Sequence, residues 1–200
     1  MMLYLVMKRL FDIIISSFLL IILLPLLIII TILVKALSKG PSIYLGERTG
    51  INNTRFYIFK FRTMFVGSDK LAGTTSRNDS RVTSIGKWLR RYKLDELPQL
   101  CNVLLGHMSI VGPRPELPLY TEKYTALELK ILSVKPGITD FASIEFHNLG
   151  DLIDDEDPDG SFERKFLSKK NQLRLKYIKK QNFLVDIIII IRTIKRLIIK

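Results

Sequence analysis

An uncharged apolar run near the N-terminus, from Ile13 to Val34, constrains the fold of this chain most strongly. As a helix it would be about 33 Å long, which is enough to cross the hydrocarbon core of a bilayer. Pro25 lies near its middle, where a proline removes a backbone hydrogen bond and kinks or breaks a helix. The run is too long for a signal peptide and lacks a small-residue cleavage pattern. We therefore expect a membrane element.

Basic residues flank this run on both sides, with Lys8 and Arg9 before it and Lys35 and Lys39 after it. Positive residues favour the cytoplasmic side of a membrane. A kinked spanning helix would leave one flank outside, whereas a re-entrant helix-hairpin broken at the proline keeps both flanks inside; the residues favour the hairpin slightly. We expect Lys8, Arg9 and Asp12 to anchor the element at headgroup level, either by pairing with one another or by ordinary snorkelling of the cations to lipid phosphates.

The charge of the chain points to anionic partners. Its 31 Lys and Arg residues against 19 Asp and Glu residues give a net charge of +12, as in proteins that bind nucleic acid, phosphate-bearing substrates or acidic lipid. Residues 183–200 place Arg and Lys at helical spacing beside a short isoleucine run, which predicts a basic amphipathic helix lying on an anionic membrane. Stacking aromatics are sparse there, so no nucleic-acid partner is expected. The lone cysteine, Cys101, fits a reducing compartment.

The residues between the two ends predict a small soluble domain. We expect residues 1–39 to form the membrane element, residues 40–182 a cytosolic domain and residues 183–200 the interfacial helix. The fold class is α+β, mainly helical, with a short β-hairpin. Strands are expected at 42–45, 55–62 and 140–146, helices at 85–92 and 116–132, a polar loop at 71–81 and a solvated acidic loop at 151–159.

An adjacent acid pair, Asp95 and Glu96, forms the most informative stretch of this domain. Apolar residues from Leu97 to Leu104 follow at i, i+3, i+4 and i+7, so they share one face of a short helix. Asp95 is expected to be its N-cap, and an isolated Asp at a helix start usually does no more than cap.

Several cations near the acid pair suggest an anion site. Arg114 lies between two prolines, which restrict its backbone and hold the guanidinium ready for a bidentate contact with phosphate. Lys60 and Arg62 share one face of a predicted strand, where they are either solvated or line an anion site. Arg90 precedes the acids in a basic helix, whose simplest interpretation is a weak surface charge network.

Taken together, these motifs resemble the bacterial sugar transferase family, the small monotopic phosphoglycosyl transferases. The resemblance extends from residue 8 to about residue 140. Besides the run interrupted by Pro25, it rests on Lys8-Arg9-x-x-Asp12, Lys60-Phe61-Arg62-Thr63-Met64, Arg81-x-Thr83, Ile85-Gly86-x-x-Leu89-Arg90, Leu94-Asp95-Glu96-Leu97-Pro98-Gln99-Leu100, Asn102-Val103-Leu104, Gly106-x-Met108-Ser109-x-Val111-Gly112-Pro113-Arg114-Pro115 and Lys135-Pro136-Gly137-Ile138-Thr139.

The resemblance implies a function. Such enzymes transfer a sugar 1-phosphate from a nucleotide sugar, commonly a UDP-sugar, to undecaprenyl phosphate at the cytoplasmic face of the bacterial inner membrane, the first membrane step of surface glycan assembly. They are described as Mg²⁺-dependent, with a covalent aspartyl-phosphosugar intermediate. By position, Asp95 would be the nucleophile and Glu96 its acidic partner in binding metal or handling protons. Arg114, Arg90, Lys60 and Arg62 would bind the substrate phosphates.

Departures from the family pattern leave the sugar open. Leu24 replaces a common serine before the membrane proline, Asp140-Phe141 falls where the family often has Gly-Trp, and His147 falls where it often has arginine. A non-catalytic membrane adaptor that binds acidic lipid or a partner through its basic surface is the alternative function. The oligomeric state is also open, a dimer being one possibility.

Overall fold

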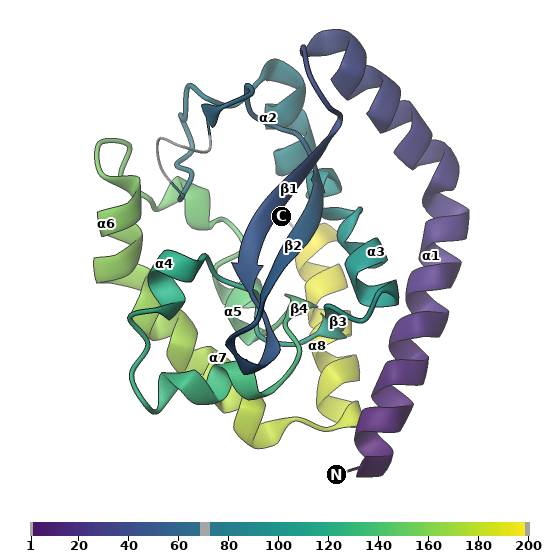
Figure 1. The fold of residues 1–200 in the computed structure, drawn as a ribbon, viewed down its shortest axis with the longest axis vertical. Helices are drawn as coiled ribbons and strands as arrows, with labels where there is room; N and C mark the ends of the chain where they lie inside the picture. The colour runs from purple at the N-terminus through teal and green to yellow at the C-terminus, as the bar shows by residue number, and fades with distance from the viewer. Residues whose placement is uncertain (1, 69–72, 199–200) are drawn as a thin grey trace.

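The computed structural model describes residues 2–68 and 73–198, and these residues form the mainly helical α+β fold expected (Figure 1). Residues 71–72 of the polar loop and 199–200 of the C-terminal helix lie outside the described residues. The helical elements in chain order are α1 (Met2–Leu37), η1 (Ile51–Asn53), α2 (Ser84–Arg91), η3 (Leu94–Glu96), α3 (Gln99–Leu104), α4 (Pro118–Thr121), η4 (Glu128–Ser133), α5 (Phe141–Glu145), η5 (Leu149–Asp151), α6 (Pro158–Phe162), η6 (Glu163–Leu167), α7 (Ser168–Lys180) and α8 (Phe183–Ile198).

The apolar N-terminal run belongs to α1, a continuous helix with Pro25 inside it. Among the described residues it is the one helix long and apolar enough to cross a membrane. A helix-hairpin is not observed: the chain does not reverse at Pro25, and α1 instead bends along one side of the molecule (Figure 1). This agrees with the smaller effect of a proline, which removes one hydrogen bond and kinks a helix without turning the chain back.

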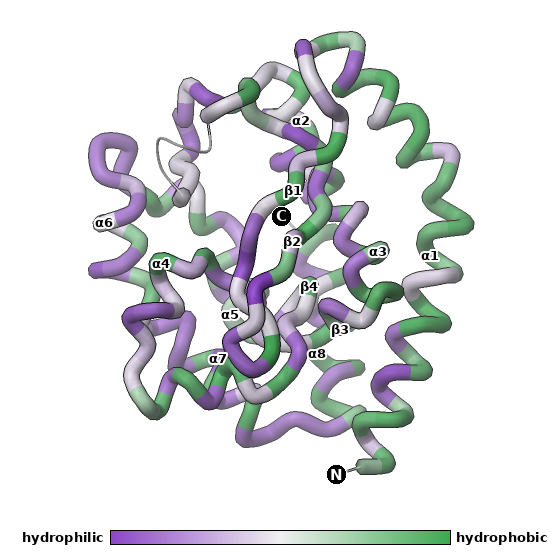
Figure 2. The backbone as a smooth tube through the Cα atoms, viewed as in Figure 1, coloured by the Kyte–Doolittle hydropathy of each residue, from purple (hydrophilic) through white to green (hydrophobic). Residues whose placement is uncertain are grey.

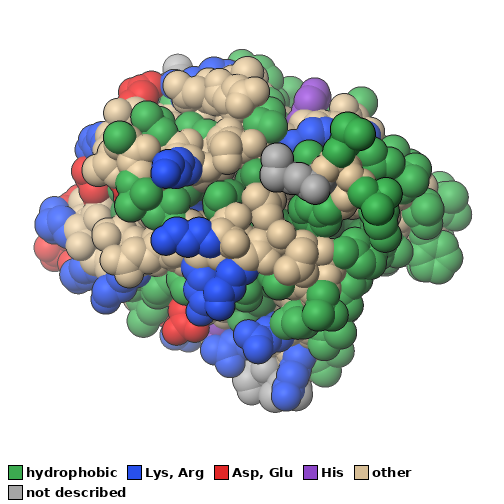
Figure 3. Space-filling model, turned by 90° about the horizontal axis from the view of Figure 1, so that it is seen from below, with side chains coloured by type: hydrophobic (Ala, Val, Ile, Leu, Met, Phe, Trp, Pro, Cys, Tyr) green, Lys and Arg blue, Asp and Glu red, His purple; other side chains and the backbone are tan. Residues whose placement is uncertain are grey.

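One face of α1 packs on the rest of the chain and the other is exposed. Near its C-terminal end, Ile30 and Val34 are buried against Phe61 and Leu89. The outward face carries exposed apolar side chains, including Leu10, Ile14, Phe18, Ile21, Ile28 and Ile32. Figure 2 shows α1 as hydrophobic along most of its length, with hydrophilic residues near its N-terminal end. Figure 3 shows apolar side chains gathered on the side of the molecule where α1 lies, with Lys and Arg nearby.

The expected β-hairpin is confirmed. Strands β1 (Ile43–Thr49) and β2 (Arg55–Phe61) pair antiparallel, with Tyr44 opposite Lys60. The turn between them uses Asn52 and Asn53 at positive φ, a conformation that asparagine tolerates better than most residues. β1 is longer than expected, since it continues to Thr49.

A second, parallel pair joins β3 (Ser109–Val111) to β4 (Gly137–Thr139). The strand expected at 140–146 is wrong, because these residues form α5. Asp140 is its N-cap, and its side chain accepts a hydrogen bond from the Ser143 N–H at 2.6 Å. A capping aspartate therefore outweighs the β-propensity of the aromatic and β-branched residues that follow. The helix expected at 116–132 is reduced to α4 and η4.

Gly137→Ala is expected to lower the free energy of unfolding by about 1–3 kcal/mol, because a Cβ there overpacks a backbone contact. That Cβ would lie 2.1 Å from the Gly112 backbone nitrogen, an approach that must push β3 and β4 apart. Chemical denaturation in detergent micelles measures the loss. Gly150→Ala is the control, because its Cβ would meet Thr75 O at 3.6 Å, an ordinary contact. Equal stability of the two variants would contradict the prediction.

The C-terminal segment forms α7 and α8. The helix expected from residue 183 is confirmed for Phe183–Ile198. Ile189 is buried against Val111 and Tyr177, while Leu184, Ile191 and the basic residues of its last turns are exposed. Not all of the basic C-terminal region faces outward, since Lys170 and Arg174 of α7 are buried.

Candidate active site

The acid pair lies in a short 3₁₀ segment, η3, in front of α3. The chain enters it through Lys93 in the left-handed conformation, with φ of 57°. The expected capping role of Asp95 is wrong: α3 begins at Gln99, and no side chain caps it. Asp95 is 6% exposed, and its Oδ1 has no hydrogen-bond partner among the described residues. Burial and the neighbouring Glu96 charge raise the pKa of Asp95, so its carboxylate is poorly solvated and more basic than usual.

Glu96, by contrast, is held by two cations. Its Oε1 accepts hydrogen bonds from Lys60 Nζ, at 2.8 Å, and from Arg114 Nη2. Burial alone would raise the pKa of Glu96, but Arg114 and Lys60 hold that pKa well below its ordinary value. The pair thus combines one poorly compensated carboxylate with one firmly ionised carboxylate, a division of roles common in active sites.

The two cations are fixed from different elements. Lys60 lies on β2, which is joined to α3 by the Asn102 side chain: its Oδ1 accepts from Phe59 N–H at 2.9 Å, and its Nδ2 donates to Tyr57 O at 2.7 Å. Arg114 follows β3. Its backbone N–H donates to Asp140 Oδ2 at 3.1 Å, which adds to the restriction by the two prolines.

The other predicted phosphate-binding cations are placed differently. Arg90 Nε donates to Thr63 Oγ1 at 2.8 Å. Of the nearby carboxylates, Asp95 has the strongest electrostatic interaction with the Arg90 guanidinium. Arg62 is 5% exposed and turns away from the acid pair toward the end of α1, where its Nη2 donates to Ser38 O at 2.6 Å. The structure therefore brings Asp95, Glu96, Lys60 and Arg114 together, with Arg90 near Asp95 and Arg62 elsewhere.

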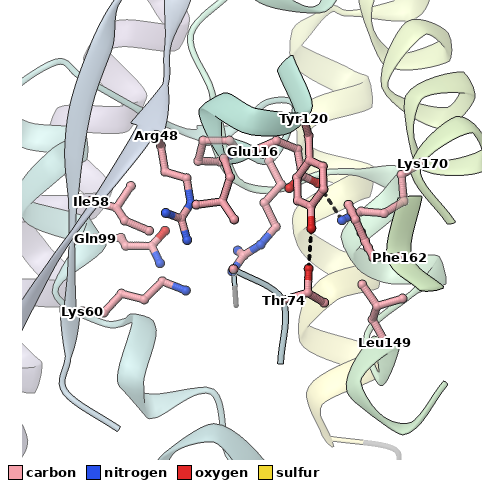
Figure 4. A pocket seen from close by; sticks show the side chains of 14 residues that line it. Arg48, Ile58, Lys60, Thr74, Gln99, Glu116, Tyr120, Leu149, Phe162 and Lys170 are labelled. Atoms are coloured by element: carbon pink, nitrogen blue, oxygen red, sulfur yellow. Dashed lines mark hydrogen bonds and ion pairs between the residues drawn. The ribbon is translucent and has the colours of Figure 1, made fainter. Parts of the chain in front are cut away.

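A pocket of about 140 Å³ opens beside Lys60 and Arg114. Figure 4 shows side chains from β1, β2 and α3 facing side chains from α4, α6 and α7 across it. Its lining includes two further cations, Arg48 and Lys170, and the buried Gln99, whose amide nitrogen and oxygen both lack partners among the described residues. Its other lining residues are Ile58, Gly73, Thr74, Pro115, Glu116, Leu117, Tyr120, Leu149 and Phe162. Such a pocket suits a polyanion with an uncharged portion.

Sequence reasoning missed Arg48, although a signal was available. Arg48 lies on β1 at period two from Tyr44, the residue opposite Lys60, so Arg48 and Lys60 share one face of the hairpin. Arg48 was missed because the strand was expected to end at residue 45, before Arg48. Gln99 and Lys170 had no comparable signal, because tertiary packing brings α3 and α7 to the pocket.

The residues expected at the membrane headgroups bond to the rest of the chain. Lys8 Nζ lies 2.6 Å from Asp186 Oδ2 on α8. Arg9 donates to the carbonyls of Val103 and Leu104 at 2.6 and 2.8 Å, at the C-terminal end of α3. Asp12 is 3% exposed, and its Oδ1 accepts from the Ile110 N–H at 3.0 Å. These contacts dock the N-terminal part of α1 onto the domain.

Metal-binding groups are few in the described part of the chain, where no cluster of three or more His, Cys, Asp or Glu side chains could hold an ion. Acidic residues of the 151–159 loop make structural hydrogen bonds: Asp157 caps α6, and Asp159 accepts from the Gly73 and Thr74 N–H groups at 3.0 and 2.7 Å. Asp95 and Glu96 remain as a candidate carboxylate pair, which would suit Mg²⁺ in combination with substrate phosphates.

Comparison with known proteins identifies the family of this chain. The bacterial sugar transferase model matches residues 3–200. The chain is 41% identical over 201 residues to "Undecaprenyl-phosphate glucose phosphotransferase" of Komagataeibacter xylinus, covering 94% of this chain but 35% of that protein. It is 34% identical over 176 residues to "UDP-N-acetylgalactosamine-undecaprenyl-phosphate N-acetylgalactosaminephosphotransferase" of Aeromonas hydrophila, covering 86% and 38%.

A relative of similar length is the "Uncharacterized sugar transferase EpsL" of Bacillus subtilis, 34% identical over 195 residues, with 97% of this chain and 88% of that protein covered. The two longer relatives carry the matched region as about a third of their length, so this chain corresponds to one part of them. The match over residues 3–200 shows that the chain belongs to the bacterial sugar transferase family.

Proposed function

We propose that this chain is a phosphoglycosyl transferase, which moves a sugar 1-phosphate from a UDP-sugar to undecaprenyl phosphate. The observation that carries the proposal is Asp95 Oδ1, a buried carboxylate oxygen without a hydrogen-bond partner, next to Glu96 and its two cations. A buried carboxylate oxygen without a hydrogen-bond partner has little solvation to lose when it attacks phosphorus. The cation-lined pocket shares Lys60 and Arg114 with the ion pairs of Glu96, and it supports binding of a diphosphate.

The reaction proceeds in two displacements at one phosphorus atom. Asp95 Oδ1 attacks the phosphorus that carries the sugar, the bond to the bridging oxygen breaks, and UMP leaves with that oxygen and its electron pair. An oxygen of undecaprenyl phosphate then attacks the same phosphorus and displaces Asp95, which regenerates the carboxylate. Lys60, Arg90 and Arg114 offset the charge that gathers at the phosphates, and splitting the transfer lets the soluble donor leave before the lipid enters.

Mg²⁺ fits this site on the chemistry of its donors. Asp95 offers an unpartnered buried oxygen, and both cations on Glu96 occupy the same oxygen, Oε1. Asp95 and Glu96 would hold the ion together with substrate phosphate oxygens. When bound, Mg²⁺ supplies positive charge for the diphosphate and the departing nucleotide.

A donor panel tests the function. Purified protein in nanodiscs is given UDP-glucose, UDP-N-acetylgalactosamine and other nucleotide sugars, with undecaprenyl phosphate and Mg²⁺, and nucleoside monophosphate release is measured. Release over many turnovers that requires both the lipid phosphate and one or a few donors is the expected result. Binding to acidic vesicles without turnover of any donor would overturn the proposal and favour the adaptor function.

We further propose that α1 is re-entrant in its topology: bent but not reversed, it enters the membrane from the cytoplasmic face and keeps both of its ends on that face, with the domain held there. Both ends of α1 contact the same domain, through Arg9 with the Val103 and Leu104 carbonyls at one end and Val34 with Phe61 and Leu89 at the other. A helix that spanned the bilayer would place these contacts on opposite sides of a membrane about 30 Å thick. The exposed apolar face of α1 would meet the acyl chains.

Cysteine labelling is expected to find both ends of α1 on one side of the membrane. In a Cys101→Ser background, single cysteines replace Met2 and Lys39, with the exposed Glu156 of the soluble domain as reference. All three should react with a membrane-impermeant maleimide in inside-out vesicles and stay protected in right-side-out ones. Labelling of Met2→Cys and Lys39→Cys from opposite sides would refute the re-entrant topology.

A further inference from the structure

Two carboxylates, Asp140 and Glu116, lie near Arg114 in the structure but take no part in the proposed reaction. Asp140 is fully buried, and its Oδ2 accepts the hydrogen bond from the Arg114 backbone N–H at 3.1 Å. Glu116 follows the second proline, with a side chain that is 12% exposed. Both act electrostatically on Arg114, as Glu96 does. Glu96 is thus the carboxylate that bonds the Arg114 guanidinium, while Glu116 and Asp140 act on it through their charge.

Arg174 of α7 reaches both flanking carboxylates from inside the protein. Its side chain has no exposed surface. Its Nη2 lies 2.5 Å from Glu116 Oε1, and its Nε lies 3.8 Å from Asp140 Oδ2. Nη1 donates to Asn171 Oδ1 at 2.8 Å, which fixes the guanidinium between the two acids.

Lys170, one helical turn earlier, also binds Glu116 Oε1, at 2.8 Å, and it lines the pocket. The spacing of four residues places Lys170 and Arg174 on one face of α7. Glu116 is therefore shared by two cations, whereas Arg174 is the cation of α7 that also approaches Asp140.

We propose that Arg174 is a positioning residue for Arg114, an inference that rests on the proposed function. Buried carboxylates need a nearby cation, because an uncompensated charge in the interior is costly. With Arg174 present, Asp140 and Glu116 are compensated and the Arg114 guanidinium stays on Glu96 beside Asp95. Without Arg174, the two acids draw Arg114 away, and the cation that should meet the substrate phosphate is displaced.

The test compares Arg174→Gln and Arg174→Lys with Asp186→Asn in nanodiscs. Asp186 is a matched control: it is also buried and ion-paired, with Lys8, but it contacts α1 and α7 instead of the Arg114 segment. The first readout is amide hydrogen exchange at Arg114, whose N–H is bonded to Asp140. The second is kcat and KM for nucleoside monophosphate release.

Arg174→Gln should raise the exchange rate at Arg114 by at least about 10-fold. It should lower kcat about 10- to 100-fold and change the donor KM less than about threefold, because a misplaced catalytic group slows the reaction more than it weakens binding. Arg174→Lys keeps the charge and should recover part of both. Asp186→Asn should alter neither. Wild-type exchange at Arg114 in both Arg174 variants, or equal changes in Asp186→Asn, would overturn the proposal. If wild-type protein turns over no donor, the proposed function fails, and the exchange readout still decides whether Arg174 positions Arg114.

Discussion

Asp95→Asn is expected to reduce nucleoside monophosphate release by at least about 10³-fold, because an amide cannot act as the nucleophile that its carboxylate provides. The substitution keeps the size and shape of the side chain. The ion pairs of Glu96 with Lys60 and Arg114 do not involve Asp95, so they should persist. Wild-type protein incubated with a radiolabelled donor, without lipid, should retain labelled sugar phosphate on the chain, and the variant should not.

Stability separates this loss from misfolding. Burial and the Glu96 charge raise the pKa of Asp95, so keeping Asp95 ionised at neutral pH opposes folding. Replacing it with a neutral amide should leave the denaturation midpoint equal or higher. Glu145→Gln, an exposed acid on α5, is the control and should retain wild-type transfer. If Asp95→Asn keeps more than about a tenth of wild-type transfer, Asp95 is not the nucleophile.

The parts of the fold that the sequence predicted are those with local signals. The apolar run became α1, the alternating residues around Lys60 became β2, and the basic stretch before the acid pair became α2, with Thr83 as its N-cap. Each depends on periodicity or capping within a few residues. The path of α1 at Pro25 could not be predicted in this way, because it depends on what α1 packs against along its whole length.

The site was predictable where backbone restriction accompanied charge. Two prolines identified Arg114, and adjacency identified Asp95 with Glu96. For Arg62, charge and strand periodicity led to the expectation that it lies beside Lys60 at the anion site. Its guanidinium instead donates to the Ser38 carbonyl at the end of α1. A cation in a strand can meet either a substrate or a helix terminus, and only the tertiary structure decides which.

The buried charge network around Arg174 lay beyond sequence reasoning for a related reason. Lys and Arg are rarely buried unless they are paired, so the basic composition of α7 gave no sign that two of its cations are buried. Their partners, Glu116 and Asp140, lie far away in the sequence. The burial of Lys170 and Arg174 could be inferred only together with these acids.

Arg114→Gln is expected to lower kcat about 10²- to 10³-fold, the range found when one preorganised charge donor is removed from an active site. Glu96 would keep Lys60 as its cation. Burial raises the pKa of Glu96 and Arg114 is the group that lowers it most, so the pKa of Glu96 should rise in the variant. Arg114→Lys keeps a point charge without the two-pronged guanidinium and should lose less, about 10-fold. Steady-state release of nucleoside monophosphate measures both. Arg55→Gln, which removes an exposed pair with Glu122, is the control and should change kcat little.

A double variant distinguishes a direct contribution of Arg114 from simple loss of its ion pair. Arg114→Gln leaves the buried Glu96 with less compensation, so the variant should also be less stable. Adding Glu96→Gln removes the carboxylate that was left behind, and the denaturation midpoint should recover. Transfer should not recover, because the substrate phosphates still lack the guanidinium and the site has lost an acid. Recovery of transfer together with stability would mean that Arg114 serves only to hold Glu96, and that the phosphates rely on Lys60, Arg90 and Arg48 instead.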